Sequence, residues 1–137
     1  MPALPPTEKA LLLRTDFHDE ISWVELCHAA QATSAEGFSA QIDCVSDPRF
    51  ADVSVDDLVK QSAKSGDRSF CFLADHQTLT DPQHPVLVLD LQEEPGRRFR
   101  VIPSELWSVE NNLSLANMDF HDFANSADPD GVFRGFR

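Results

Sequence analysis

Residues 69–91, SFCFLADHQTLTDPQHPVLVLDL, decide the fold of this chain. They hold two apolar runs, at 69–74 and 85–91, joined by the polar stretch DHQTLTDPQHP. Continuous apolar runs of this length are typical of strands that are buried on both faces of a sheet. We therefore predict two central strands of an α/β sheet here, joined by a loop that is long enough to carry a functional site.

The residues that follow predict a hairpin and two helices. Pro95-Gly96 suits the two central positions of a β-turn, so residues 98–101 should pair with the preceding strand as an antiparallel hairpin. Pro103-Ser104 should open the next helix, and Asp119 with Asp122 predicts a capping box that opens a shorter helix. The C-terminal end is expected to pack back onto the domain as a tail.

The residues that precede the segment alternate between strand and helix patterns. Residues 10–14 form an apolar run, and residues 38–44 alternate apolar with polar side chains, so both stretches predict strands. Asp16 is the expected N-cap of a helix that follows the first strand. A second helix is expected over residues 55–63, with Ser54 as its cap.

The expected order of elements is therefore β-α-β-α-β-β-β-α-α. Alternating strands and helices favour right-handed parallel crossovers in the first half, and the hairpin adds an antiparallel portion. We predict a single α/β domain over residues 10–137, after a loose lead-in at residues 1–9. Its mixed sheet should have about five strands, with helices packed on it.

Composition restricts the choice of partner. The chain has 137 residues, which suits one domain, and 23 acidic against 11 basic side chains give it a net charge of −12. Such a field repels phosphate groups, so neither nucleic acid nor an anionic membrane surface is an expected partner. A basic protein, a cationic ligand and a metal ion all fit the charge, and so does plain solubility.

The cysteine pattern indicates the cellular compartment of the protein, and the absence of known sequence motifs indicates whether it uses a cofactor. Cys27, Cys44 and Cys71 have no spacing suited to zinc, and the N-terminus lacks the basic start of a secretion signal. We expect buried thiols in a cytoplasmic protein. The dinucleotide, P-loop, zinc-protease and nucleophile-elbow motifs are all missing, so we expect no cofactor and assign no metal ligands.

One functional hypothesis places chemistry at the carboxyl ends of the strands, where open α/β sheets collect ligands. His76 would be the general acid or base of a lyase, isomerase or hydrolase, oriented by Asp75 or Asp90, while Arg100 holds a substrate carboxylate. The alternative interpretation is structural, because aspartate is common at strand ends simply for its ability to turn and cap the chain.

Residues 103–120, PSELWSVENNLSLANMDF, form the most unusual stretch. Asn111 and Asn112 are poor helix formers inside an expected helix, and departures from local preference are frequent at functional sites. In one interpretation these amides bind a ligand or a partner, or polarise a carbonyl in the enzyme hypothesis. In the other, they satisfy loop carbonyls and lock the C-terminal helices together.

Our preferred hypothesis is a non-catalytic binding or accessory protein that uses the segment from Trp107 to Asp119 and an acidic face. Tryptophan is enriched among interface hot spots, so Trp107 is the natural anchor if it is exposed. A protein partner and a small molecule both stay open as occupants, as does the oligomeric state. The residues expected to bind are Arg100, Trp107, Glu110, Asn111, Asn112 and Asn117.

The tetrapeptide DFHD occurs twice, at 16–19 and 119–122. A metal motif is one interpretation of this repeat. Both copies also fit helix N-termini, which would place His18 and His121 at the surface in first turns. Capping is the interpretation that we prefer.

A resemblance rests on four stretches that together span most of the chain: LLLRTDF, SAEGFSAQIDCVSDPRFADVSVDDL, HPVLVLDLQEEPGRRFRVIPSE and RVIPSELWSVENNLSLANMDFHDFA. These resemble a family of small single-domain proteins of unknown function in bacteria and fungi, with a C-terminal motif of the PSELWSVENNLSLANMDF type. The likeness covers residues 10–136. It implies a single domain and carries no activity.

Overall fold

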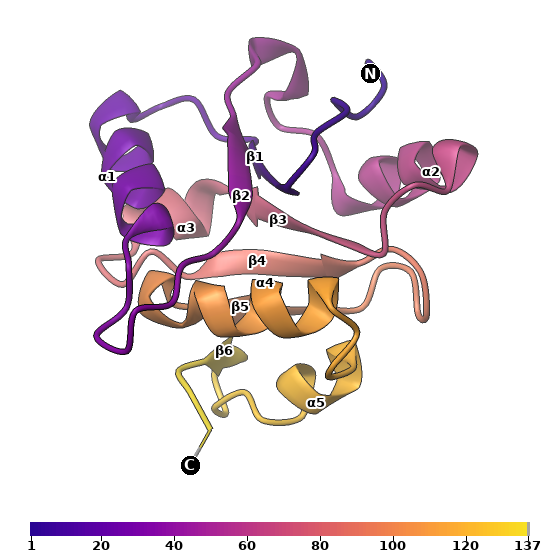
Figure 1. Cartoon of the computed structure of the whole chain (residues 1–137). Coiled ribbons are helices and arrows are strands. Elements are labelled where there is room, and N and C mark those ends of the chain that lie inside the picture. The colour runs from indigo at the N-terminus through magenta and orange to yellow at the C-terminus, as the bar shows by residue number, and fades with distance from the viewer. Residues whose placement is uncertain (137) are drawn as a thin grey trace.

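A six-stranded mixed sheet forms the centre of the computed structural model, which describes residues 1–136 (Figure 1). The strand order is β2-β1-β3-β4-β5-β6. β1 runs parallel to β2 and β3, β4 is antiparallel to both of its neighbours, and β6 is parallel to β5. The strands are β1 (Ala10–Arg14), β2 (Ile42–Val45), β3 (Phe70–Ala74), β4 (Val86–Asp90), β5 (Arg98–Val101) and β6 (Val132–Phe133).

Five α-helices accompany the sheet: α1 (Glu20–Gln31), α2 (Val55–Ser65), α3 (His76–Thr80), α4 (Leu106–Ser114) and α5 (Phe120–Ala124). Short 3-10 turns span Pro48–Phe50 and Pro103–Glu105. Among residues 1–136, no helix is long and apolar enough to cross a membrane. The predicted single α/β domain with a mixed sheet is confirmed. β6 is an additional strand, formed by the tail that was expected to pack back.

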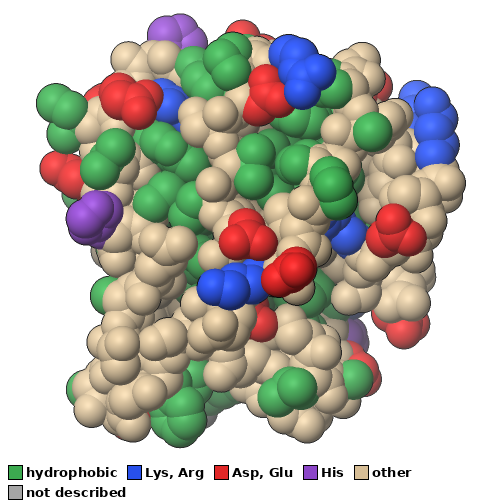
Figure 2. Space-filling model, turned by 45° about the horizontal axis from the view of Figure 1, so that its top comes forward, with side chains coloured by type: hydrophobic (Ala, Val, Ile, Leu, Met, Phe, Trp, Pro, Cys, Tyr) green, Lys and Arg blue, Asp and Glu red, His purple; other side chains and the backbone are tan. Residues whose placement is uncertain are grey.

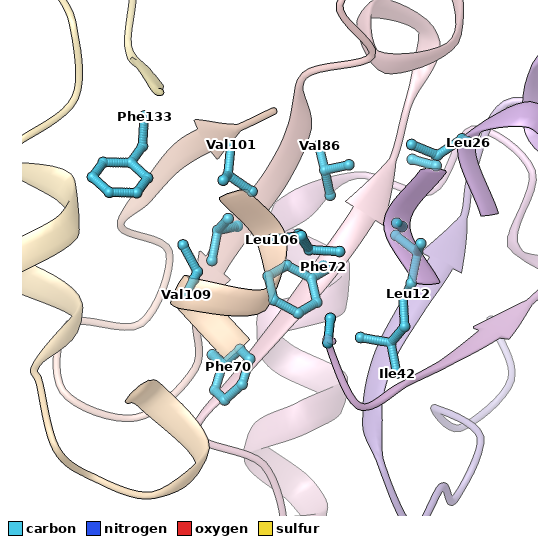
Figure 3. Close-up of a cluster of buried hydrophobic side chains, with 14 of the residues drawn as sticks. Leu12, Leu26, Ile42, Phe70, Phe72, Val86, Val101, Leu106, Val109 and Phe133 are labelled. Atoms are coloured by element: carbon cyan, nitrogen blue, oxygen red, sulfur yellow. The ribbon is translucent and has the colours of Figure 1, made fainter. Parts of the chain in front are cut away.

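The sheet buries both of its faces, because successive side chains of each strand point to opposite sides. Leu12, Phe72 and Val88 belong to the larger core cluster, which also takes side chains from α1, α4 and α5 (Figure 3). Cys71 and Leu89 face the other way, into a smaller cluster covered by the 3-10 turn at 48–50 and by α2. The continuous apolar runs of β3 and β4 therefore follow from burial on both sides.

Local signals fix the starts of most helices. The Ser54 hydroxyl accepts a hydrogen bond from the Asp57 backbone N–H, so α2 begins as predicted. Asp119 and Asp122 form the predicted capping box of α5. The prediction that Asp16 caps α1 is wrong: the cap is Asp19, whose carboxylate accepts from the backbone N–H of Ser22.

Two other stretches differ from the sequence prediction. β2 begins only at Ile42, because the preceding segment is held by α4: the backbone N–H of Gln41 donates to Glu110. The expected loop after β3 contains the short helix α3, capped by Asp75. The lead-in at 1–9 is fastened in places, since Leu4 packs on the smaller cluster and Arg68 donates to the Pro5 carbonyl. Arg137, the last residue of the predicted domain, lies outside the described residues.

Replacing Phe123 by alanine should destabilise the domain strongly. Its ring is fully buried and contacts the rings of Phe99 and Phe133. Truncation removes these contacts and leaves a cavity, so we expect a loss of about 3–5 kcal/mol in the free energy of unfolding, measured by urea denaturation. Leu115→Ala is the control, because Leu115 is 70% exposed and should change stability by less than about 0.5 kcal/mol. Similar losses for both variants would contradict this packing.

Candidate functional site

The carboxyl ends of β1 and β3 bring together Asp16, His18 and His76. The Oδ1 atom of Asp16 lies 2.5 Å from Nδ1 of His18, and its Oδ2 atom lies 2.8 Å from Nδ1 of His76. The Asp16 side chain is only 7% exposed, whereas the two imidazoles are 80% and 75% exposed. A buried carboxylate thus orients two solvent-facing rings from two different strand ends.

Parallel pairing explains this meeting, because β1 and β3 end at the same edge of the sheet. The backbone N–H of Thr15 donates to the Ala74 carbonyl and continues the pairing up to the cluster. The sequence analysis considered Asp16 and His18 as part of the DFHD repeat but preferred helix capping, so it did not place them at the site. The useful signal was the position of both Asp16 and His76 two residues after the end of a predicted parallel strand.

Hydrogen bonding shifts the acidity of the pair formed by Asp16 and His18. The hydrogen bond to Asp16, and then the charge of that carboxylate, raise the pKa of His18 above its usual 6.5. For Asp16, burial acts to raise the pKa, but hydrogen bonds from His18 and His76 outweigh burial and lower the pKa. At neutral pH Asp16 is therefore a carboxylate that stabilises the protonated form of His18.

The other residues of the enzyme hypothesis are placed differently. Asp75 caps α3 and binds Arg100 through both carboxylate oxygens, at 2.7 and 2.9 Å. Asp90 lies at the opposite end of the sheet, since it pairs with Phe70 at the start of β3. Its carboxylate accepts backbone N–H groups of the hairpin turn, from Gln92 to Glu94. Asp16, rather than Asp75 or Asp90, is the residue that contacts His76.

The polar side chains of α4 are turned toward the protein itself. Glu110 is buried, and it accepts hydrogen bonds from the Gln41 backbone and the Ser114 hydroxyl. The Asn111 amide donates to the Ser39 carbonyl and to Glu110. These contacts fasten the stretch before β2 to α4.

The two other asparagines close the end of the same helix. The Asn112 side chain donates to the Ser108 carbonyl within α4. The Asn112 carbonyl accepts the backbone N–H of Asn117, whose side chain is exposed. The interpretation that these amides satisfy local carbonyls accounts for the contacts of Asn111 and Asn112.

Trp107 borders a large open pocket of about 830 Å³. Its walls come from the end of α1 with residues 32–36, from residues 82–84 after α3, and from residues 102–105 with Trp107. The volume lies in the range of small-molecule sites. The Trp107 ring is partly exposed and stacks on Phe38, with centroids 4.7 Å apart and planes 12° apart.

Two carboxylates give this pocket its electrostatic character. Glu105 and Glu36 both line it, and none of the described side chains forms an ion pair with either residue. Burial, and then the nearby charge of Glu36, raise the pKa of Glu105. Arg134 also lies at the pocket, but its guanidinium is bound to Asp128, Asp130 and Gln83. The unbalanced charge at Glu105 and Glu36 is therefore negative.

On the surface seen in Figure 2, the acidic side chains do not form one continuous patch. Asp and Glu side chains appear there as separate groups, several beside Lys or Arg, with apolar side chains between them. Among the described residues, ion pairs to arginine are formed by Glu20, Asp47, Asp75, Glu94, Asp128 and Asp130. A site for a cation thus depends on acids that lack such a partner.

Fold and pocket together define a single-domain α/β protein with an acidic, partly apolar pocket. The chain belongs to the family described as Domain of unknown function (DUF6924), which matches residues 9–136. A search of curated proteins finds no match to the chain. The family membership agrees with the resemblance seen in the sequence and assigns no activity.

Replacing Asp16 by asparagine should lower the pKa of His18, measured by NMR titration of the histidine rings.

A folded-state pKa above the unfolded value means that the His18–Asp16 pair stabilises the fold fully below about pH 6.5. This contribution is lost as the pH rises through the folded-state pKa of His18. The difference in unfolding free energy between the native chain and His18→Ala should therefore shrink from pH 5.5 to pH 8.5.

The second DFHD copy supplies the control for this titration. Asp119→Asn makes the same chemical change at the equivalent position of the repeat. It should leave the pKa of His18 unchanged. An equal shift in both variants would mean that general charge, rather than the contact with Asp16, sets the acidity of His18.

Proposed function

We propose that this protein is a non-catalytic binding protein whose pocket beside Trp107 takes a small organic cation with an apolar body. The observation that carries the proposal is the pair of acids Glu105 and Glu36 in a largely apolar pocket, without an ion-pair partner among the described residues. Glu105 is partly buried, so its carboxylate loses solvation free energy that an ammonium or guanidinium group of a ligand would offset.

The pocket walls suit the apolar part of such a ligand. Alanines of the α1 end, Pro82, Ile102 and Pro103 give it a nonpolar lining. Trp107 offers an aromatic ring, and a cation near the face of a tryptophan gains about 0.5–2 kcal/mol. The overall charge of −12 further raises the local concentration of cations.

Trp107, the anchor residue predicted from the sequence, borders the same pocket. Trp107 is held in place by its stacking on Phe38 and by its position in the first turn of α4. Asn111 and Glu110 support the site indirectly, because they fasten α4 to the stretch before β2. Among the predicted binding residues, Trp107 thus borders the pocket, while Glu110 and Asn111 position its helix.

Three probes of similar size test the charge preference: 2-phenylethylamine, 2-phenylethanol and 3-phenylpropionate. Calorimetric titration should show binding of the amine and much weaker binding of the alcohol and the acid. Glu105→Gln should weaken amine binding by more than about tenfold, as expected for one charge-assisted hydrogen bond of about 1.5 kcal/mol or more. Binding should also weaken as the pH falls toward the raised pKa of Glu105, because the protonated acid no longer attracts the cation.

Asp56→Asn is the matched control, since it also removes one negative charge but lies in the first turn of α2, away from the pocket lining. It should leave amine affinity nearly unchanged. Equal affinities for the alcohol and the amine, or equal losses in the two variants, would contradict the proposal. Tighter binding of a lysine-containing tripeptide than of any free amine would favour a partner protein as the occupant instead.

A further inference from the structure

We propose that Asp16, His18 and His76 form a binding site for a late first-row divalent metal ion, with Zn²⁺ as the best-fitting ion. The carboxylate and the two imidazoles offer three ligand atoms that all lie within 4.8 Å of one another. Two histidines with one carboxylate are a recurrent ligand set for such ions. A metal site with three protein ligands leaves one coordination position of the ion open for water.

The ligand chemistry selects the class of ion. Imidazole nitrogen suits zinc, copper and nickel, whereas Ca²⁺ and Mg²⁺ take oxygen ligands. Here two of the three donors are nitrogen atoms from His18 and His76. This donor set therefore favours a cation that prefers nitrogen, and the net charge of −12 favours cations in general.

The backbone around Asp16 is fixed before any ion arrives. Its carbonyl accepts a hydrogen bond from the buried Arg14 side chain at 2.8 Å, and its Oδ1 atom accepts the His18 backbone N–H at 3.0 Å. The Thr15 carbonyl accepts the backbone N–H of Asp52. Such outer contacts hold metal ligands in position and reduce the cost of ordering them.

His76 is positioned independently, from the other strand. It is the first residue of α3, whose start is set by the Asp75 capping box. Asp75 is itself held by the two hydrogen bonds from Arg100. Because the two imidazoles are largely exposed, an ion bound between them would keep open positions toward solvent.

Metal binding must displace the protons that the rings now share with Asp16. In a neutral ring the proton moves from Nδ1 to Nε2, which frees the Nδ1 lone pair for the ion. A doubly protonated ring instead releases one proton to solvent.

The second DFHD copy lacks the partners that such a site needs. His121 lies in α5, where its Nδ1 atom is 3.3 Å from the Arg97 guanidinium, and its ring also contacts Asn125. A fixed cation beside the ring opposes a metal ion at that position. The same four residues thus form a candidate site only where β3 supplies a second histidine.

The test is calorimetric titration of Zn²⁺ into the full-length chain, without a histidine tag, after treatment with a chelator. We expect one ion per chain. His18→Ala and His76→Ala should each weaken binding by more than about tenfold, since loss of even an outer-shell partner costs that much. His121→Ala should bind zinc as the native chain does.

A spectroscopic readout separates this site from adventitious binding. Co²⁺ should give visible absorption bands of a low-coordinate nitrogen and oxygen site, absent in both His18→Ala and His76→Ala, while circular dichroism shows that these variants remain folded. No zinc binding, or binding that survives both substitutions, would overturn the proposal. So would an equal loss in His121→Ala, or a loss in Cys44→Ser, which would identify the half-buried thiols Cys27 and Cys44 as the ligands.

Discussion

The pairing of β3 with β1 on one side and β4 on the other is the constraint on which the rest of this structure depends. β3 is buried on both faces, and its side chains feed both core clusters. It is parallel to β1 and antiparallel to β4, so the direction of the sheet changes at this strand. That change decides which strand ends meet.

Both candidate sites follow from this arrangement. Because β1 and β3 end at one edge, Asp16 and His76 meet there, while Asp90 is carried to the opposite edge at the end of β4. The start of β4 and the end of β5 return to the first edge, since Val86 pairs with Val101. Residues 82–84, which precede β4, and residues 102–105, which follow β5, line the pocket at those two strand ends. Figure 1 shows α1 beside α3 at this side of the sheet.

Charge is distributed so that most buried ions are satisfied within the fold. Arg14 is buried and bound to Glu20 and the Asp16 carbonyl, and Arg100 is bound to Asp75. Two groups of side chains are the proposed places where a bound cation would interact with the protein. They are the acids Glu105 and Glu36, and the exposed imidazoles of His18 and His76. The first suits an organic cation and the second a metal ion, and each is tested by its own variants.

The sequence determined the elements whose signals are local. Apolar runs located β1, β3 and β4, Pro95-Gly96 located the hairpin turn, and Ser54 and Asp119 located two helix starts, because these depend on contacts within a few residues. It failed at Asp16, where capping and a long-range contact compete for the same carboxylate. It also missed β6, which is too short to show a pattern of its own.

Only the tertiary structure decided the sites. That His76 meets Asp16, and that Trp107 borders a pocket with Glu105 and Glu36, depends on strand order and direction, which bring together residues distant in the chain. The sequence could name His76 and Trp107 as candidates from their residue types. It could not name their partners, because the energy of such contacts depends on separations in space that no local pattern records.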